Sequence, residues 1–145
     1  MEGDKKVNAL ETLKTYFGYD TFREGQEKIV EAILTNRDVL AIMPTGAGKS
    51  ICYQIPALIL PGITLVISPL ISLMQDQVKA LNDAGIHAAF INSSLTENQI
   101  SKALYLAASG RYKIIYVAPE RLENYEFLEL GFNKYMALTK SGTTE

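Results

Sequence analysis

Residues 43–50 read Met-Pro-Thr-Gly-Ala-Gly-Lys-Ser, and this stretch decides the fold. It follows an apolar run, 39–43, that predicts a buried strand, and it precedes an apolar segment, 51–60, that predicts a buried helix. Gly46 and Gly48 permit a tight loop whose backbone N–H groups surround an anion, and the following helix points its positive end at the same place. The sequence therefore predicts a phosphate-binding loop between a strand and a helix.

The loop also carries the side chains that a nucleotide triphosphate requires. The Lys49 ammonium can reach the β and γ phosphates, and the Ser50 hydroxyl can complete the shell of a Mg²⁺ ion. We therefore predict that ATP and Mg²⁺ bind here, with Lys49 and Ser50 as the catalytic residues of the loop. The predicted nucleotide contacts are Thr45, Gly46, Ala47, Gly48, Lys49 and Ser50. The general pattern has glycine where this chain has Met43, so a glycine-rich turn with an exposed lysine is the alternative.

Short apolar runs alternate with amphipathic segments along the chain, which is typical of an α/β fold with a parallel sheet and helices on both faces. Strands are predicted at 39–43, 64–67, 88–91 and 114–117. Helical apolar faces are formed by Leu70, Leu73, Met74, Val78 and Leu81, by Ile100, Ala103, Leu104 and Ala107, and by Ile29, Val30, Ile33 and Leu34 ahead of Asn36. Capping boxes are predicted at Ser72 with Gln75 and at Thr96 with Gln99, while Pro56 is expected to kink or end the helix at 51–60.

Composition excludes several classes of protein. Of the 145 residues, 48% are hydrophobic and 21% are charged, and the net charge is −2, which argues against a disordered chain and a strongly basic nucleic-acid module. The single cysteine, Cys52, excludes an internal disulfide and is expected to be a small buried hydrophobe. No apolar run is long enough to span a membrane, so we expect a soluble, intracellular protein with no membrane partner.

Gln26 precedes Lys49 by 49 − 26 = 23 residues, which is room for one helix and one strand. A glutamine amide complements the N6 and N7 edge of adenine. Spacing alone nevertheless favours a solvated residue at a helix start. His87, which has no cysteine or carboxylate cluster beside it in the sequence, is expected to be structural.

Taken together, these residues resemble the RecQ family of ATP-dependent DNA helicases, in helicase superfamily two. The resemblance covers roughly residues 8–122 and runs through Phe17-Gly18-Tyr19, Phe22-Arg23, Gln26, 43–50, Cys52 to Ala57, Ser68 to Met74, Asp76-Gln77, Asn92-Ser93 and Ala118 to Leu122. It implies an ATP-binding front part, residues 1–122, of the first RecA-like motor lobe, an incomplete lobe of the phosphate-loop NTPase fold. The family tolerates Met43, and Ala47 is a mild departure from its usual glycine.

The resemblance also implies residue roles. Gln26 would read the adenine edge while Tyr19 and Arg23 stack on its faces. The implied contacts to the backbone of single-stranded or forked DNA are Ser68, Pro69, Asn92, Ser93 and Arg121, at the carboxyl ends of predicted strands. A surface salt bridge is the alternative for Arg121. The intact enzyme would unwind DNA in the 3′ to 5′ direction, in DNA repair and recombination, in the cytoplasm at the nucleoid.

The chain lacks parts that hydrolysis requires. It contains no Asp-Glu pair to hold Mg²⁺ and orient water, and no second lobe to supply an arginine. Residues 135–139, in the tail 123–145, resemble the family's strand before its third motif, so the chain is either internally deleted or joined across a missing stretch. We expect it to bind ATP without efficient hydrolysis, and DNA only weakly. Rival functions are a small-molecule kinase and a nucleotide-gated interaction module. The oligomeric state is not indicated.

Overall fold

The computed structural model describes residues 8–44, 48–123 and 136–138. These residues fall into two compact units, one up to Pro61 and one from Gly62 onward, and each unit is described by itself. The predicted boundary after residue 122 adjoins residues outside the described ranges and stays a prediction. In the described part of the chain, no helix combines the length and apolarity needed to cross a membrane.

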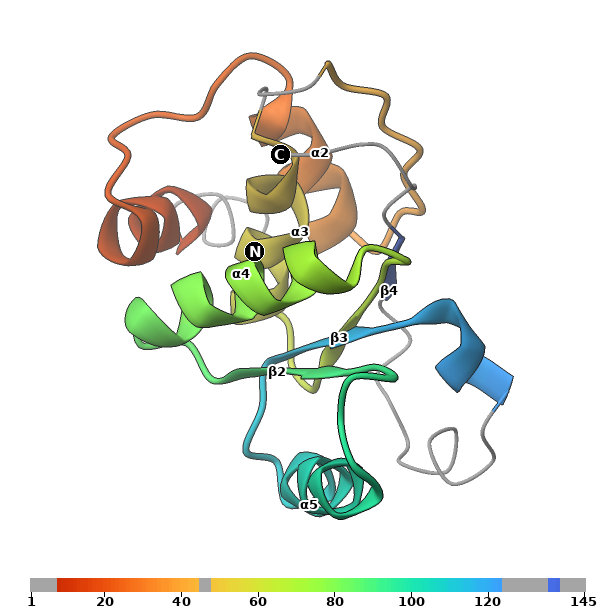
Figure 1. Ribbon diagram of the computed structural model, residues 1–145. Coiled ribbons are helices and arrows are strands. Elements are labelled where there is room, and N and C mark those ends of the chain that lie inside the picture. The colour runs from red at the N-terminus through yellow and green to blue at the C-terminus, as the bar shows by residue number, and fades with distance from the viewer. Residues whose placement is uncertain (1–7, 45–47, 124–135, 139–145) are drawn as a thin grey trace. The chain divides into compact units, whose positions relative to one another are not determined.

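The unit from Gly62 onward is built on a parallel sheet (Figure 1). Its strands are β1 (Thr64–Ile67), β2 (Ala88–Ile91), β3 (Ile114–Val117) and β4 (Met136–Leu138), in the spatial order β2-β3-β1-β4. The predictions of strands at 64–67, 88–91 and 114–117 are confirmed with the same bounds. Every residue of β1 and β3 is buried, as the lack of polar alternation in the sequence indicates.

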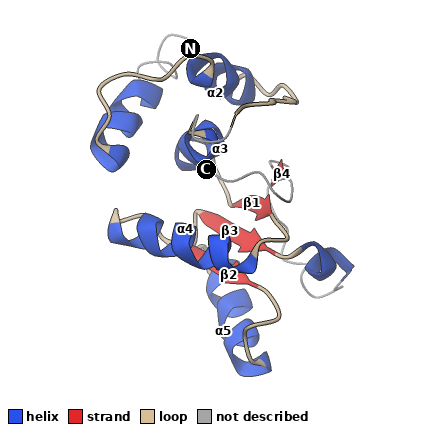
Figure 2. Ribbon diagram, turned by 45° about the horizontal axis from the view of Figure 1, so that its top comes forward, coloured by secondary structure: helices blue, strands red, loops and turns tan. Residues whose placement is uncertain are grey.

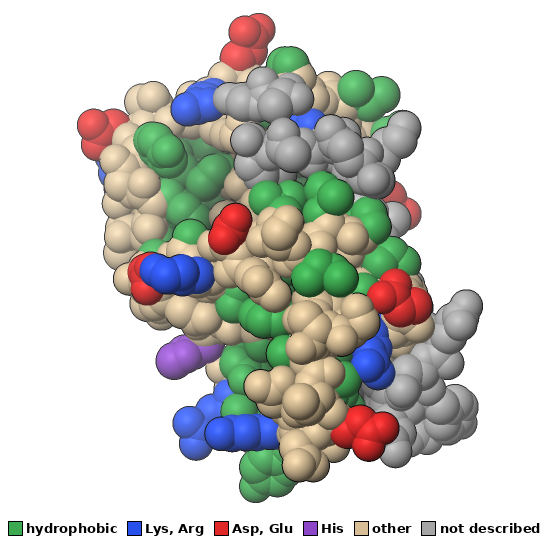
Figure 3. Space-filling view, viewed as in Figure 1, with side chains coloured by type: hydrophobic (Ala, Val, Ile, Leu, Met, Phe, Trp, Pro, Cys, Tyr) green, Lys and Arg blue, Asp and Glu red, His purple; other side chains and the backbone are tan. Residues whose placement is uncertain are grey.

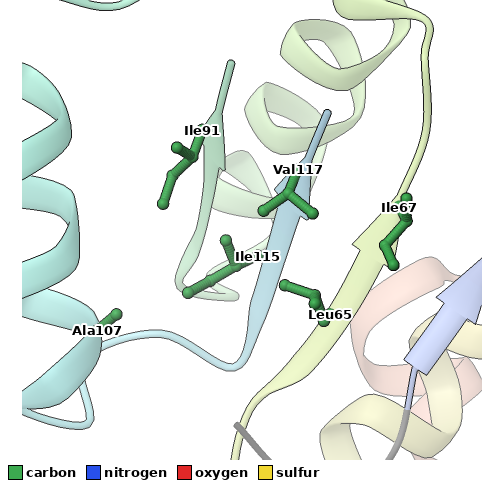
Figure 4. Packing of buried hydrophobic residues seen from close by; sticks show 6 residues of the cluster. All are labelled: Leu65, Ile67, Ile91, Ala107, Ile115 and Val117. Carbon is green, nitrogen blue, oxygen red and sulfur yellow. The ribbon is translucent and has the colours of Figure 1, made fainter. Parts of the chain in front are cut away.

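Two helices cover opposite faces of this sheet: α4 (Ile71–Asp83) and α5 (Glu97–Ala108), as Figures 1 and 2 show. The α5 face holds the core cluster drawn in Figure 4, which consists of Leu65, Ile67, Ile91, Ala107, Ile115 and Val117. On the α4 side, Met74, Val78 and Leu81 are buried, and the Tyr116 hydroxyl donates to Gln77 Oε1 at 2.6 Å. The expected α/β fold with helices on both faces of a parallel sheet is therefore confirmed.

The helix starts confirm one predicted capping box and contradict the other. Thr96 caps α5, its hydroxyl accepting from Gln99 N while the Gln99 side chain accepts from Thr96 N. Ser72 instead lies inside α4, whose N-cap is Leu70. The chain turns earlier than predicted because Ser68 Oγ accepts from Leu70 N at 3.2 Å, so the helix has already begun at Ile71.

The unit up to Pro61 is helical. Residues 8–12 are α-helical and continue into the π-helical turn η1 (Leu13–Phe17), which ends at Gly18 with a φ of 74°. Two further helices, α2 (Gln26–Leu34) and α3 (Lys49–Ile59), pack against each other. The helix at 51–60 is confirmed as buried nearly all round, but Pro56 lies inside α3 and does not end it. Cys52 is buried, as expected.

The prediction of a strand at 39–43 is wrong. Residues 37–44 form no helix or strand, and the Leu40 and Ile42 side chains are 90% and 91% exposed. Apolar residues favour a strand only where a neighbouring strand can pair with them, because β propensity is largely a measure of packing on a sheet. This segment has no such neighbour among the described residues. Of the tail at 123–145, only Glu123 and residues 136–138 are among the described residues.

We predict that Ile115→Ala lowers the free energy of unfolding by about 2–5 kcal/mol, because the removed methyl groups leave a cavity in the cluster of Figure 4. Urea denaturation followed by circular dichroism measures the change. Tyr105→Ala is the control, since Tyr105 is 72% exposed and its truncation should stay within about 0.5 kcal/mol. Equal unfolding midpoints for the two variants would contradict the assignment of this core.

Candidate functional site

The helix α3 begins directly after a glycine in the left-handed conformation. Gly48 is the N-cap, with φ 77° and ψ 46°, a left-handed conformation that favours glycine. Lys49 and Ser50 are the first two residues of the helix, and both are half-buried. A glycine at the N-cap offers no side-chain acceptor to the first-turn N–H groups, which suits an anion as their acceptor. Thr45, Gly46 and Ala47 lie outside the described residues.

Gln26 is tied to this helix start. It is the first residue of α2, its side chain is 3% exposed, and its Nε2 donates to the Gly48 carbonyl at 2.9 Å. Its Oε1 accepts from the Arg23 N–H at 2.8 Å. A Cβ added to Gly48 would lie 2.5 Å from Gln26 Nε2, so the amide at the end of this side chain would have to move, while the φ of 77° itself favours glycine. The structure therefore brings Arg23, Gln26 and Gly48 together.

The remaining predicted adenine contacts lie at the surface. The Tyr19 side chain is 50% exposed and Arg23 is exposed. Met43, the residue that departs from the general loop pattern, has its Sδ 3.8 Å from Cys52 Sγ. Cys52 Sγ also lies 3.9 Å from the Gly48 carbonyl oxygen. The Met43 thioether thus lies beside Cys52 near the start of α3, and the sequence pattern carried no signal for this contact.

The carboxyl ends of three strands form a second group of candidate residues. Ser68 N donates to Val117 O at 3.0 Å, and Ala118 N donates to Ile91 O at 3.2 Å, so the loops after β1, β3 and β2 leave the sheet side by side. The predicted residues Ser68 and Asn92 stand at this edge, but their side chains are 3% and 0% exposed. Both side chains accept hydrogen bonds from the main chain of their own loops.

The exposed predicted residues of this edge are Pro69 and Ser93. Arg121 is half-buried and lies in the 3₁₀ helix η2 (Pro119–Glu123), with its N–H bonded to Ala118 O at 3.0 Å. The sequence reasoning missed Ser94, whose N–H and hydroxyl both donate to Asn92 Oδ1. An Asn followed two residues later by Ser is a known turn pattern and was the available signal.

Charge is mixed over the surface. On the face drawn in Figure 3, lysine and arginine side chains lie among acidic and uncharged ones, and the whole chain carries a net charge of −2. Among the residues that the structure describes, no three His, Cys, Asp or Glu side chains are grouped to hold a metal ion. Ser50, the residue predicted to bind Mg²⁺, is the second residue of α3. Mg²⁺ commonly takes its other ligands from phosphates and water.

Comparison with known proteins places the chain among helicases. The family model described as DEAD/DEAH box helicase matches residues 23–139. The chain is 51% identical over 126 residues to "ATP-dependent DNA helicase RecQ" of Haemophilus influenzae and 52% identical over 123 residues to the protein of that name in Bacillus subtilis. The matches cover 87% and 84% of this chain but only 20% and 21% of those proteins. The chain thus spans about a fifth of the length of these curated relatives.

The solved structures support the fold. A crystal structure of a hypothetical ATP-dependent RNA helicase from Sulfolobus tokodaii superposes with a TM-score of 0.62 at 22% identity, over 88% of this chain and 37% of that one. At this identity the likeness shows the fold alone, and it confirms the expected RecA-like α/β architecture. The expected homology to RecQ ATP-dependent DNA helicases is confirmed by the sequence matches.

We predict that Gly48→Ala destabilises the chain more than Gly18→Ala does. Both glycines have nearly the same φ, 77° and 74°, so the strain of placing alanine in the left-handed region, about 1–2 kcal/mol, is shared. Only the Gly48 methyl group meets another atom, whereas Gly18 has nothing within 4 Å. Moving the Gln26 amide away breaks its bond to the Gly48 carbonyl, so Gly48→Ala should cost about 1 kcal/mol more.

Urea unfolding of the two variants measures this difference. The same pair is then compared in a Gln26→Ala background, where the extra cost at position 48 should disappear because the clashing amide is gone. An extra cost that persists without the Gln26 amide would show that the contact with Gln26 is not its source.

Proposed function

This chain belongs to the DEAD/DEAH box helicase family, and we propose that it is the ATP-binding segment of the motor of an ATP-dependent DNA helicase. The observation that carries the proposal is the start of α3, where left-handed Gly48 leads into Lys49 and Ser50 and is tied to Gln26. Family membership argues against the rival small-molecule kinase. A nucleotide-gated module that binds ATP without turnover remains the alternative.

In this proposal, different residues of the chain bind the phosphates and the Mg²⁺ ion of the nucleotide. The first-turn N–H groups of α3 and its positive end hold the β and γ phosphates, and Lys49 neutralises their charge. Ser50 would hold a Mg²⁺ ion through its hydroxyl, and such an ion would shield the phosphate charge. Gly48 keeps side-chain atoms away from the phosphates because it has none.

We propose that Gln26 reads the adenine edge, with Tyr19 and Arg23 at the two faces of the ring. The Gln26 amide already bonds the Arg23 N–H and the Gly48 carbonyl, so adenine must share or exchange these bonds. If adenine replaced the bond between Gln26 and the Gly48 carbonyl, binding of the base would affect the position of Gly48. Tyr19, half-exposed, suits a stacking role because an aromatic face is available to the base.

The proposed nucleic-acid substrate is single-stranded or forked DNA, held at the carboxyl edge of the sheet by the loops that contain Ser68-Pro69, Asn92-Ser93 and Arg121. Open parallel sheets bind their ligands at this edge. Contacts to the DNA backbone position a strand without reading its bases, as a translocating motor requires. With DNA as substrate, we propose the cytoplasm, at the nucleoid, as the place of action.

Lys49→Ala should weaken ATP binding at least tenfold, about 1.4 kcal/mol, because it leaves phosphate charge uncompensated beside the helix start. Isothermal titration calorimetry with Mg²⁺ and ATP measures the affinity. Lys28→Ala, an exposed lysine of α2, is the control for the loss of one positive charge and should bind like the parent. Equal affinities for the Lys49 variant and the parent would refute the phosphate-loop assignment.

The parent chain should prefer ATP over GTP, because guanine presents a carbonyl where adenine presents an amine. Gln26→Ala should reduce this preference. Gln26→Glu should reduce it too, since a carboxylate keeps the acceptor for Arg23 N–H but has no N–H for adenine or for the Gly48 carbonyl. Competition of the two nucleotides against a fluorescent analogue reports the ratio. A parent chain that binds GTP as well as ATP excludes the base-reading role.

A further inference from the structure

The turn that follows β2 is built around one buried amide. Asn92 is the first residue beyond β2, and none of its surface is exposed. Its Oδ1 accepts from Ser94 N at 2.8 Å and also from the Ser94 hydroxyl. Its carbonyl accepts from Leu95 N at 3.2 Å. Asn92 therefore determines where the main chain goes over the next three residues.

Packing alone does not account for an asparagine at this position. Its Nδ2 donates to Met74 Sδ at 3.6 Å, and a thioether is a weak acceptor. A buried amide with a weak partner costs free energy that an apolar side chain of similar size would not. The strong hydrogen bonds of this side chain are the two that Asn92 Oδ1 accepts from Ser94. The amide of Asn92 is therefore needed to hold the turn after β2.

Ser93 lies between the two anchored positions, at the surface as Ser94 does. Ser93 is exposed, and within the described part of the chain neither its N–H nor its hydroxyl has a hydrogen-bond partner. Asn92 and Ser94 are fixed on either side of it. Ser94 Oγ also lies 3.5 Å from Gln75 Nε2, which links the turn to α4. Two donors of Ser93 are therefore presented by a turn that is held in place.

A second loop of the same edge uses the same device. Ser68 follows β1, is 3% exposed, and accepts from the N–H two residues on, that of Leu70, as Asn92 accepts from Ser94. Pro69 occupies the exposed position that corresponds to Ser93. Pro69 has no N–H, so of these two exposed residues only Ser93 can donate a hydrogen bond to a ligand.

We propose that Asn92 is a positioning residue, which does not touch nucleic acid but holds the Ser93 N–H and hydroxyl toward a phosphate of single-stranded DNA. The inference rests on the proposed function of this sheet edge and deepens it. Small neutral donors bind phosphate oxygens without reading bases. They also release no counterions, so they add affinity without steepening its salt dependence.

The test compares Asn92→Ala with Asn92→Ser in the full chain. Both variants remove most of the side chain and leave nearly the same cavity beside Met74, but serine keeps an oxygen that can accept from Ser94 N, as Ser68 does from Leu70 N. The probe is a fluorescent oligothymidine, with anisotropy measured at several salt concentrations. Calorimetry with ATP and urea unfolding are run on the same samples.

Micromolar or weaker affinity is expected for the parent because the chain is slightly negative. Asn92→Ala should bind DNA about threefold or more weakly, the worth of one hydrogen bond, with an unchanged salt slope and unchanged ATP affinity. Asn92→Ser should recover most of the parental affinity. In ¹⁵N spectra of the parent, the Ser93 amide signal should shift on DNA addition, and this shift should shrink in Asn92→Ala.

Unchanged DNA affinity in Asn92→Ala overturns the inference, as does an equal loss in both variants, which is the result that cavity formation alone predicts. A parent that binds DNA without any shift of the Ser93 amide overturns it as well, while the proposed DNA-binding function stands. A parent that binds no DNA even at low salt overturns both the DNA contact of this edge and the positioning role.

Discussion

Strands β1 and β3 are the two strands of the sheet with a hydrogen-bonded neighbour on each side, and the unit from Gly62 onward depends on their pairing. Parallel strands cannot be joined by a tight turn, so the connections from β1 to β2 and from β2 to β3 are crossovers, and each carries a helix. The helices α4 and α5 thereby cover opposite faces and bury every residue of β1 and β3. The same topology brings the carboxyl ends to one edge, where the loops of Ser68 and Asn92 lie on either side of the loop that follows β3.

The start of α3 depends on a different constraint, which is local to α2 and α3. The sequence context that predicts such a loop is a strand before it and a helix after it, and the structure contains only the helix. The backbone of Gly48 is nevertheless in the left-handed form, with the Gln26 amide bonded to its carbonyl. The start of α3 therefore does not require a strand at 39–43 in order to take this form.

A feature could be predicted from the sequence when the residues that determine it lie close together in the chain. The strands at 64–67 and 114–117 were predictable because both of their faces are buried, and 88–91, which is only partly buried, was predictable because its apolar run is uninterrupted. The run 39–43 is apolar in the same way. Whether it forms a strand depends on a partner strand elsewhere in the chain, which no local sequence pattern reveals. The burial of Gln26 was not predictable for the same reason. Its spacing favours a solvated residue, while its partner, the Gly48 carbonyl, is 22 residues away.

Gln26 and Asn92 share a physical property that explains why each is an amide. In both, the side-chain oxygen accepts a main-chain N–H close in sequence, from Arg23 and from Ser94, while the nitrogen donates to a second element, at Gly48 or Met74. A carboxylate offers only acceptors, so it would repel the Gly48 carbonyl, and a hydroxyl is too short to span two elements. A buried amide can thus hold its own turn and attach that turn to a neighbouring helix. Each loop proposed to meet a phosphate, at Gly48 and at Ser93, is supported by such an amide.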